Sequence, residues 1–432
     1  MAILSRSSAF SRVLALAEQR PLHEAFRWLH LHSQQMLHWQ MELVAIPAPP
    51  FGEEQRSLWM ARRFLEVGLS DVYTDAIGNV FGTIPKSNSE PENEPEDQSP
   101  IILLSAHLDT VFPLDTPLKP ILRGERIEAP GACDNASGII GLLAIAQALL
   151  ISRMPLGANL VFVGNVGEEG EGDLRGVRHI YQHSPYAGRI AAHIVLDGAG
   201  AETAVTQALG SRRYQVTVNG PGGHSFTDAG TPNPILILAS ALTTLAESSR
   251  DHFPDEPRST LNVGTIQGGT SVNTIPEIAT ATVEFRCTDL RPLVRLEVAL
   301  HRAVEDAVDA ANAKVSVRSD RREQKHSPGL LRYIIEKIGD RPASELPCES
   351  PLMEAIKAVD RHLGLRTDLR LGSTDANIPL SLGIPAVSLG AGGEGGGAHT
   401  RAEWYSAANR ELGLRRVLLL TLAMLDWAGK QS

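Results

Sequence analysis

Residues 101–110 read IILLSAHLDT, an apolar run that ends in a histidine and an aspartate. A run of this length without a charged residue before its end is typical of a strand buried on both faces. Two further runs of this kind occur at residues 159–165 and 193–198, and helical patterns fill the intervals at residues 136–152 and 174–183. The alternation predicts an α/β fold with a mixed, mostly parallel sheet flanked by helices.

The pattern changes twice along the chain and so divides it into three segments. From about residue 210 it becomes that of amphipathic strands and two helices, in the order strand–helix–strand–strand–helix–strand, closing at KVSVRS (314–319). The α/β pattern then resumes. We therefore expect a discontinuous domain formed by residues 1–209 and 323–432, whose first 45 residues are a helical extension. An α+β, ferredoxin-like domain at residues 210–322 is inserted in it.

The overall composition excludes several classes of protein. The chain has 432 residues, 43% hydrophobic and 21% charged, which is the composition of a globular protein long enough for two cores. The net charge of -10 and the lack of a basic stripe argue against a nucleic-acid partner. The longest apolar run, at residues 139–151, is too short to span a membrane. Three separated cysteines and no leader pattern favour the cytoplasm.

The first polar residues of interest follow the run at residues 101–107. In open α/β sheets, ligands bind beyond the carboxyl ends of the strands. His107 and Asp109 lie there two positions apart, so in an extended chain both side chains point to the same side. Asp109 can therefore orient the imidazole of His107, as carboxylates do for metal-bound histidines. A strand-end histidine that only caps a loop is at least as common.

Two other segments place carboxylates at similar positions. GACDNASG (131–138) precedes a helix, and either Asp134 or Asn135 could be the N-cap of that helix. The segment after the strand at residues 159–165 contains Glu168 and Glu169 between glycines. Adjacent glutamates are usually solvated and inert, but a solvated pair would not need flanking glycines at a strand end. The pair is therefore a candidate for catalysis or metal binding.

The last two segments complete a set of metal-ligand types. Asp197 ends a further apolar strand, and the glycine-rich stretch at residues 390–398 leads to His399. Two histidines and several carboxylates form the ligand set of zinc, although cobalt and manganese accept it too. Carboxylates gathered at a buried edge repel one another unless cations neutralise them. Two ions bridged by a carboxylate would do so, and a free glutamate could serve as base for a hydrolytic water.

The order of these motifs resembles that of one family. HLD, GACDNASG, GEEGEGDLRG, LDG, GGHSF and GAHT follow one another as in the co-catalytic di-zinc exopeptidases and amidohydrolases. That family includes peptidase T, carboxypeptidase G, aminoacylase, acetylornithine deacetylase and succinyl-diaminopimelate desuccinylase. The resemblance spans residues 47–427. It implies a zinc exopeptidase-like catalytic domain with an inserted lid and dimerisation domain, two Zn²⁺ per subunit with Co²⁺ or Mn²⁺ as alternatives, and a homodimer formed through the lid domain.

The resemblance also implies which residues bind the metals. It makes His107, Asp134 and Asp197 the ligands of one zinc ion. The other zinc ion is held by Asp134, Glu169 and His399. Asp134 is therefore the carboxylate that bridges the two ions.

Three residues gain a catalytic role from the same resemblance. Asp109 supports the ligand His107. Glu168 is the base that deprotonates the bridging water and later protonates the leaving amine. His224 of GGHSF matches the family's lid histidine, which lies over the active site of the partner subunit and stabilises the oxyanion with the zinc ions.

Five further residues resemble substrate-binding positions of the family. Asn273 and Arg286 resemble lid residues that hold the substrate carboxylate or oxyanion, although Arg286 also fits a structural ion pair. Ser373, Asp375 and Asn377 belong to STDAN, which resembles a loop lining the pocket beside the metals. A capped turn is the alternative interpretation of that loop.

The resemblance and the residues together predict a metal-dependent hydrolase. It cleaves an amide bond of a short peptide by metal-activated water, as an exopeptidase of the aminopeptidase, tripeptidase or carboxypeptidase type. GEEGEGDLRG and STDANIP look most like the peptidase T branch. An N-acyl amino acid deacylase on the same fold is the alternative, and a non-catalytic peptide-binding dimer is a third hypothesis. Short peptides or N-acyl amino acids are the expected ligands, with no nucleic acid and no membrane.

Overall fold

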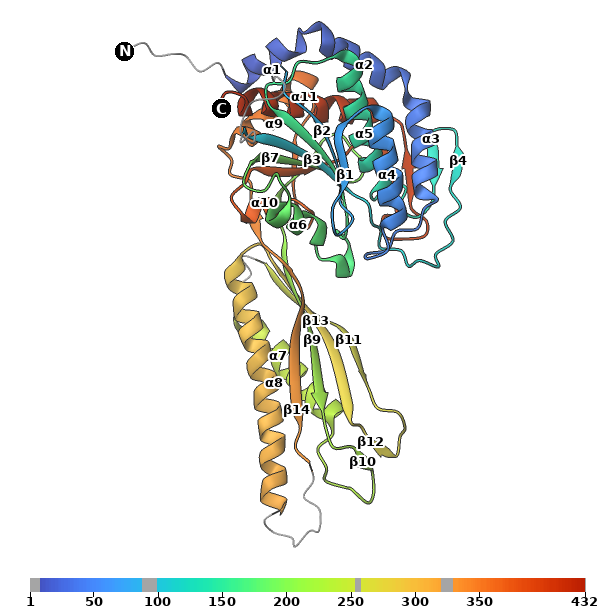
Figure 1. The fold of residues 1–432 in the computed structure, drawn as a ribbon. Helices are drawn as coiled ribbons and strands as arrows, with labels where there is room; N and C mark the ends of the chain where they lie inside the picture. The colour runs from blue at the N-terminus through green and yellow to red at the C-terminus, as the bar shows by residue number, and fades with distance from the viewer. Residues whose placement is uncertain (1–7, 88–98, 253–257, 320–328, 432) are drawn as a thin grey trace, which may run out of the picture. The chain divides into compact units, whose positions relative to one another are not determined.

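The computed structural model describes residues 8–87, 99–252, 258–319 and 329–431. Contacts between residues divide the chain into two units. Unit 1 consists of Met1–Ala208 and Glu345–Ser432, and unit 2 consists of Leu209–Ser344. Figure 1 shows the elements of both.

Unit 1 contains a nine-stranded sheet with the order β1-β2-β6-β3-β7-β17-β8-β15, in which β16 also pairs with β8. The adjacent strands β6, β3, β7 and β17 run parallel to one another. In contrast, β1 pairs with β2, and β2 pairs with β6, in the antiparallel sense. The mixed sheet expected from the sequence is thus confirmed. Its strands are β1 (Ser70–Thr74), β2 (Val80–Ile84), β3 (Ile101–His107), β6 (Asn159–Asn165), β7 (Ile190–Leu196), β8 (Thr203–Ala208), β15 (Ser344–Glu345), β16 (Asp368–Gly372) and β17 (Ala386–Leu389).

Helices cover both faces of this sheet. Ile102 and Leu104 of β3 belong to the main core of unit 1, whereas Ile101 and Leu103 pack with Ile180 in a separate core. Alternate residues of a strand point to opposite faces, so the strand is apolar throughout because both faces are buried. The helices of unit 1 are α1 (Ala9–Ala17), α2 (Arg20–Leu31), α3 (Ser33–Val44), α4 (Glu54–Val67), α5 (Ala136–Ser152), α6 (Arg175–His183), α9 (Pro351–Leu363), α10 (Asn377–Ser381) and α11 (Arg410–Ala428).

A second, four-stranded sheet in unit 1 has the order β18-β19-β5-β4, with antiparallel pairing throughout. Its strands are short, and β4 is exposed along its whole length. They are β4 (Ile121–Arg123), β5 (Arg126–Glu128), β18 (Glu394–Gly396) and β19 (Trp404–Ser406). The turn between β18 and β19 contains His399, so this small sheet positions one of the candidate ligands.

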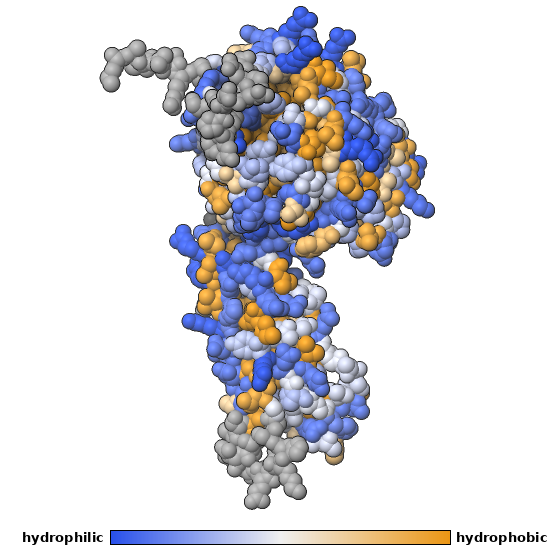
Figure 2. Space-filling view, in the orientation of Figure 1, coloured by the Kyte–Doolittle hydropathy of each residue, from blue (hydrophilic) through white to orange (hydrophobic). Residues whose placement is uncertain are grey.

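Unit 2 has the order strand–helix–strand–strand–helix–strand around an antiparallel sheet β11-β13-β9-β14. Tyr214, Val216 and Val218 of β9 alternate with less buried residues and form one core with α7 and α8. Figure 2 shows hydrophobic side chains scattered among hydrophilic ones on its surface. The elements are β9 (Gly210–Asn219), β10 (Gly223–His224), α7 (Pro234–His252), β11 (Ser259–Gly268), β12 (Thr274–Ile275), β13 (Ile278–Cys287), α8 (Leu290–Ser319) and β14 (Arg332–Arg341).

The end of unit 2 differs from our expectation. The sequence KVSVRS was expected to be the closing strand, but it is the last part of α8. Val308, Ala311 and Val315 are buried and recur every three or four residues, which is the spacing of a helix face. The closing strand is instead β14, which pairs with β9. The expected boundary at 322–323 lies outside the described residues, and unit 2 extends beyond it to Ser344.

Within the described ranges, no helix combines the length and the apolar character required to cross a bilayer.

Candidate metal centre

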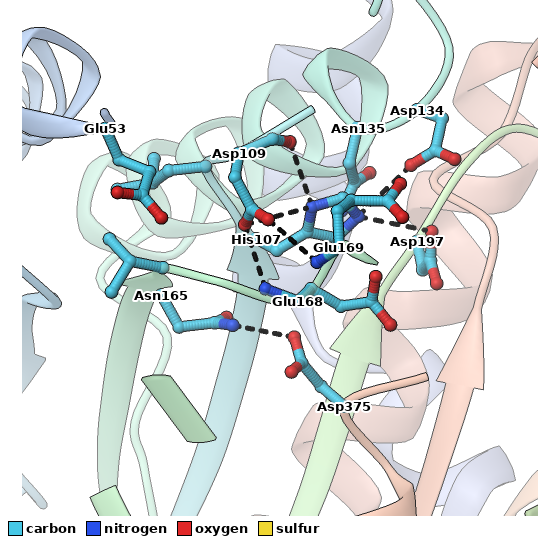
Figure 3. A network of polar contacts seen from close by, with 12 residues as sticks. Glu53, His107, Asp109, Asp134, Asn135, Asn165, Glu168, Glu169, Asp197 and Asp375 are labelled. Atoms are coloured by element: carbon cyan, nitrogen blue, oxygen red, sulfur yellow. Dashed lines mark hydrogen bonds and ion pairs between the residues drawn. The ribbon is translucent and has the colours of Figure 1, made fainter. Parts of the chain in front are cut away.

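The candidate site of unit 1 lies where three neighbouring parallel strands end. His107 is the last residue of β3 and Asn165 is the last residue of β6, while Asp197 follows β7 directly. Parallel strands leave their carboxyl ends on one edge, so these side chains gather there. Figure 3 shows the carboxylates of Asp134, Asp197 and neighbouring residues around the imidazole of His107.

His107 lies between carboxylates on both sides of its ring. Its Nε2 is 3.1 Å from Oδ1 of Asp134 and 3.8 Å from Oδ1 of Asp197. Its Nδ1 is 3.1 Å from the backbone oxygen of Asp109 and 3.6 Å from the carboxylate of Asp109. Burial alone would lower the pKa of His107, but these three carboxylates raise it well above its ordinary value.

Asp134 connects the two histidines of the site. Its Oδ1 faces His107, and its Oδ2 is 3.0 Å from Nε2 of His399, which is itself 3.1 Å from Oε1 of Glu169. Burial would raise the pKa of Asp134, yet the hydrogen bonds with both imidazoles hold it well below its usual range. The hydrogen bonds of His399 with Asp134 and Glu169 raise the pKa of His399 to about 10.

These donor atoms fit a cation site. Ligand atoms of His107, Asp134 and Glu169 all lie within 4.8 Å of one another. Oδ1 of Asp134 is buried and makes no hydrogen bond within the described chain, although it is close to His107. Both imidazoles attract protons because the surrounding carboxylates favour positive charge. Imidazole nitrogens and carboxylate oxygens are the ligands that zinc accepts, and the two oxygens of Asp134 face separate histidines, as a bridging carboxylate requires.

Asp109 holds the loop that carries the two glutamates. Its carboxylate is fully buried and accepts the backbone N–H groups of Glu168 at 3.0 Å and of Glu169 at 2.8 Å. Burial raises the pKa of Asp109, but His107 and these two N–H groups lower it below the ordinary value. One ionised side chain therefore orients the imidazole of His107 and fixes the backbone of the adjacent glutamates.

The same loop is anchored from its other side by Arg175. Nη2 of Arg175 lies 2.8 Å from both carboxylate oxygens of the buried Glu53. The backbone N–H of Arg175 donates to the oxygen of Gly167, directly before Glu168. The chain around the glutamates is thus fixed at both ends.

Asn135 is the N-cap of α5, which settles the alternative left open by the sequence. Its Oδ1 accepts the N–H of Gly138 at 3.0 Å and the N–H of Gly198 at 3.1 Å. Its Nδ2 donates to the backbone oxygen of Leu196 at 2.8 Å. Asn135 therefore joins the start of α5 to the segment that carries Asp197, and it leaves the carboxylate of Asp134 free to face the histidines.

Glu403 was missed by the sequence analysis. It is buried, and its Oε1 accepts the N–H groups of Cys133 and Asp134, each at 2.8 Å. Its Oε2 accepts the N–H of Gly131, also at 2.8 Å. Burial raises the pKa of Glu403, while these bonds oppose the rise. Glu403 thus holds the turn that presents Asp134, from a position far away in the sequence.

The STDAN loop contributes one buried carboxyl group at the same edge. Oδ2 of Asp375 accepts a hydrogen bond from Nδ2 of Asn165 at 2.7 Å, and burial raises the pKa of Asp375 to about 7. Asn377 is fully buried and accepts the N–H of Thr374, which makes the loop a capped turn. Ser373 is half-buried beside it.

The remaining three predicted residues belong to unit 2. His224 is exposed in β10, which pairs with β12, and Asn273 lies just before β12. The backbone oxygen of Asn273 accepts the N–H of Ser225, which follows His224 directly, so Asn273 lies close to the segment that carries His224. Arg286 in β13 donates from Nε and Nη2 to the carboxylate of Glu284, both at 2.9 Å. This is the ion pair that the sequence left as an alternative role for Arg286.

Comparison with known proteins identifies the family. The model of Peptidase family M20/M25/M40 matches residues 103–423. The chain belongs to this family. The match includes all of the candidate metal ligands and confirms the resemblance that the order of the motifs indicated.

The curated relatives that this chain matches are named as different enzymes of the family. A probable carboxypeptidase of Aspergillus oryzae is 26% identical over 266 residues, which are 56% of this chain and 60% of that protein. Acetylornithine deacetylase of Myxococcus xanthus is 29% identical over 280 residues, 60% of this chain and 70% of that protein. The match to the first of these relatives thus spans about three fifths of its length.

Solved structures share the fold over most of the chain. Aminopeptidase PepT of Bacillus cereus has a TM-score of 0.67 at 18% identity, covering 91% of this chain and 98% of that one. A dinuclear metal-binding peptidase of Bacillus subtilis has a TM-score of 0.62 at 14% identity, covering 92% of this chain and 99% of that one. At these identities the likeness concerns the fold alone.

Proposed function

We propose that this protein is a metal-dependent hydrolase that cleaves an amide bond near the end of a short peptide. The observation that carries the proposal is the position of Asp134, whose two oxygens face His107 and His399 at 3.1 and 3.0 Å. Glu169 and Asp197 supply further oxygen ligands around the same histidines. Membership of the peptidase family and the geometry of these side chains support the same reaction class.

The two metal ions are assigned in this proposal as the resemblance implies. His107, Asp134 and Asp197 would hold one ion, and Asp134, Glu169 and His399 the other. Zinc is the proposed metal, with cobalt and manganese accepted by the same ligands. Bound there, the ions would supply Lewis acidity, which polarises a carbonyl group and acidifies water.

The chain itself supplies the proton transfer. Glu168 is buried, and its backbone is fixed by Asp109 beside the candidate ligand Glu169. We assign to Glu168 the role of base, which accepts a proton from the attacking water and delivers it to the leaving amine. Asp109 keeps His107 oriented through Nδ1, so that Nε2 faces the metal position.

An exopeptidase of the aminopeptidase or tripeptidase type is the proposed subclass. The GEEGEGDLRG and STDANIP segments support this choice, because they resemble the peptidase T branch. An N-acyl amino acid deacylase is the alternative, favoured by the 29% identity to an acetylornithine deacetylase. A peptide-binding protein without catalysis is less favoured, because each position that the chemistry needs is filled.

Dimer formation and cellular location also belong to the proposal. In the four-stranded sheet of unit 2, β11 is an edge strand and is exposed along most of its length. Unpaired edges of this kind favour pairing with a second chain, which supports a homodimer through unit 2. In such a dimer we assign His224 to the partner's active site, as the family resemblance implies. The three free cysteines fit the reducing cytoplasm.

Exchange of Glu168 for glutamine tests the proposed base. Glu168→Gln keeps the shape of the side chain but cannot accept the proton, so turnover of a tripeptide should fall by at least about a hundredfold. Glu171→Gln is the matched control, because Glu171 lies in the same motif and is exposed. Bound metal, measured by atomic emission, should stay at two equivalents in both variants. A Glu168→Gln enzyme with full activity would contradict the assignment.

A substrate panel separates the two subclasses. Tripeptides with a free amino group are compared with N-acetylated amino acids, using protein reconstituted with zinc, cobalt or manganese. Hydrolysis of the tripeptides alone supports the exopeptidase. Hydrolysis of the N-acetylated compounds alone would assign the protein to the deacylases, and two equivalents of metal with no hydrolysis of either set would contradict the proposal.

A further inference from the structure

A cavity of about 510 Å³ borders the small sheet of unit 1. One wall is formed by β5 and the residues that precede β4, including Lys119 and Arg126. The other wall is formed by residues 401–403 between His399 and β19. Both walls adjoin candidate metal ligands in the sequence, because Asp134 follows the first wall closely and His399 precedes the second by two residues.

Three cationic side chains line this cavity, namely Lys119, Arg126 and Arg401. Lys119 and Arg401 are exposed and pair with no carboxylate in the parts of the chain that the structure describes. Arg126 stacks on the ring of Trp404, with 3.8 Å between the guanidinium carbon and the ring centroid. Its Nε is 3.5 Å from Glu128 and makes no hydrogen bond to a described residue.

The two carboxylates of the cavity do not balance these charges. Glu128 is shared, because Arg123 from outside the cavity approaches it to 3.1 Å while Arg126 stays at 3.5 Å. Glu403 is buried, and its oxygens accept three backbone N–H groups. Lys119 and Arg401 therefore remain available to an anion from solution. This excess of positive charge contrasts with the net charge of -10 of the chain and with the acidic metal centre next to it.

Arg286, which the family resemblance suggests as a partner of the substrate carboxylate, is bonded to Glu284 within unit 2. Both Arg286 and Arg213 donate to Glu284 within unit 2, and these bonds lower the pKa of that glutamate despite its burial. The guanidinium group of Arg286 is thus already paired with a carboxylate. The unpaired cations of the cavity in unit 1 offer a carboxylate an alternative partner close to the candidate metal ligands.

We propose that this cavity, with Lys119 and Arg401 as its free cations, binds a carboxylate of the peptide substrate. The carboxylate belongs to an acidic side chain or to the C-terminus of the peptide. The proposal rests on the hydrolysis proposed above and adds to it a preference for acidic substrates. Arg126 contributes a third positive charge, and its stacking on Trp404 holds it in place.

Paired substrates and charge-removing variants test this proposal. Tripeptides with Glu or Gln at each position in turn, and with a free or an amidated C-terminus, distinguish the two sources of the carboxylate. The measured quantity is the ratio of kcat/KM for the acidic member to that for the neutral member of each pair. Lys119→Gln and Arg401→Gln should each lower this ratio up to about fivefold, and the double variant about tenfold or more.

Two control variants keep the comparison matched. Arg62→Gln on α4 and Lys357→Gln on α9 remove exposed cations of unit 1 that do not line the cavity. Both should leave the ratio within about twofold of the parent value. A parent enzyme that does not prefer the acidic member of any pair would overturn the proposal, and so would a double variant whose ratio stays within about twofold of the parent value.

A binding arm separates this inference from the proposed function. Calorimetric titration of the same peptide pairs into Glu168→Gln protein, with and without the double exchange, needs no turnover. Tighter binding of an acidic peptide that is lost on the double exchange supports the cavity even if no peptide is hydrolysed. If peptides are hydrolysed but acidic peptides bind no tighter than neutral ones, the inference about the cavity is wrong, while the proposed function is still supported.

Discussion

Exchange of Glu403 for glutamine tests how the turn before α5 is held. The carboxylate of Glu403 accepts three backbone N–H groups, all at 2.8 Å. Glutamine offers one acceptor oxygen, and its amide nitrogen would face an N–H donor. A hydrogen bond to a charged group contributes about 1.5–3 kcal/mol, and relief from burying the charge offsets part of that loss. We therefore expect Glu403→Gln to lower the free energy of unfolding of unit 1 by about 3 kcal/mol.

Tryptophan fluorescence measures this change in unit 1 alone. All five tryptophans of the chain lie outside Leu209–Ser344, so the signal during urea unfolding does not report on unit 2. Glu394→Gln is the matched control, because Glu394 lies exposed in β18 of the same small sheet. Metal affinity should fall about 10- to 100-fold in Glu403→Gln, because Asp134 loses its support. An unchanged urea midpoint and unchanged metal affinity would refute the reasoning.

Two further perturbations probe buried charges of unit 1. Burial raises the pKa of Asp375 from 3.8 to about 7 in the folded protein, so metal-free protein should lose up to about 4 kcal/mol of stability as the pH rises between these values. Urea unfolding at a series of pH values should show this loss in the parent protein and not in Asp375→Asn. The same dependence of stability on pH in both proteins would contradict the reasoning. Arg416 donates two hydrogen bonds to the buried Asp360, at 2.6 and 2.8 Å. Arg416→Met should therefore lower the free energy of unfolding by about 3–5 kcal/mol, whereas Arg416→Met combined with Asp360→Leu should lower it clearly less. Equal losses of stability in the two variants would disprove a penalty for the unpaired carboxylate.

The strand ends of unit 1 could be predicted because their signal is local. A strand buried on both faces must be apolar throughout, so the polar residue that ends it stands out, as His107 does after Ile101–Ala106. The parallel arrangement then brings Asp197 to the same edge as His107, 3.8 Å away. These two steps need only the hydrophobic pattern and the rule for open α/β sheets.

The support around the candidate ligands could not be predicted in the same way. Glu403 acts on backbone N–H groups, and any residue except proline offers such a group, so no side-chain pattern reveals the contact. The sequence pattern shows Asn165 as the polar residue that ends β6, but its hydrogen-bond partner Asp375 lies in a loop more than 200 residues later. Only the fold brings such pairs together.

The closing strand of unit 2 was misassigned for a different reason. Val315 alternates with polar neighbours in KVSVRS, which is the period of a strand. In the structure, α8 continues because Val315 adds one more buried turn beyond Ala311. The actual strand β14 has mostly exposed or half-buried residues at its start, so its apolar pattern is weak. Packing against the rest of the unit overrode the local preference of six residues.

The place of β17 in the sheet determines the order in which the two units can fold during synthesis. β17 lies between β7 and β8, although about 190 residues separate it from β7 in the chain. At about 5–20 residues per second, the ribosome needs about 10–40 s to make this interval. Unit 2 therefore emerges entirely before the central strand of unit 1 exists. A nascent chain therefore passes through a stage in which all of unit 2 has been made while the large sheet of unit 1 still lacks β16 and β17.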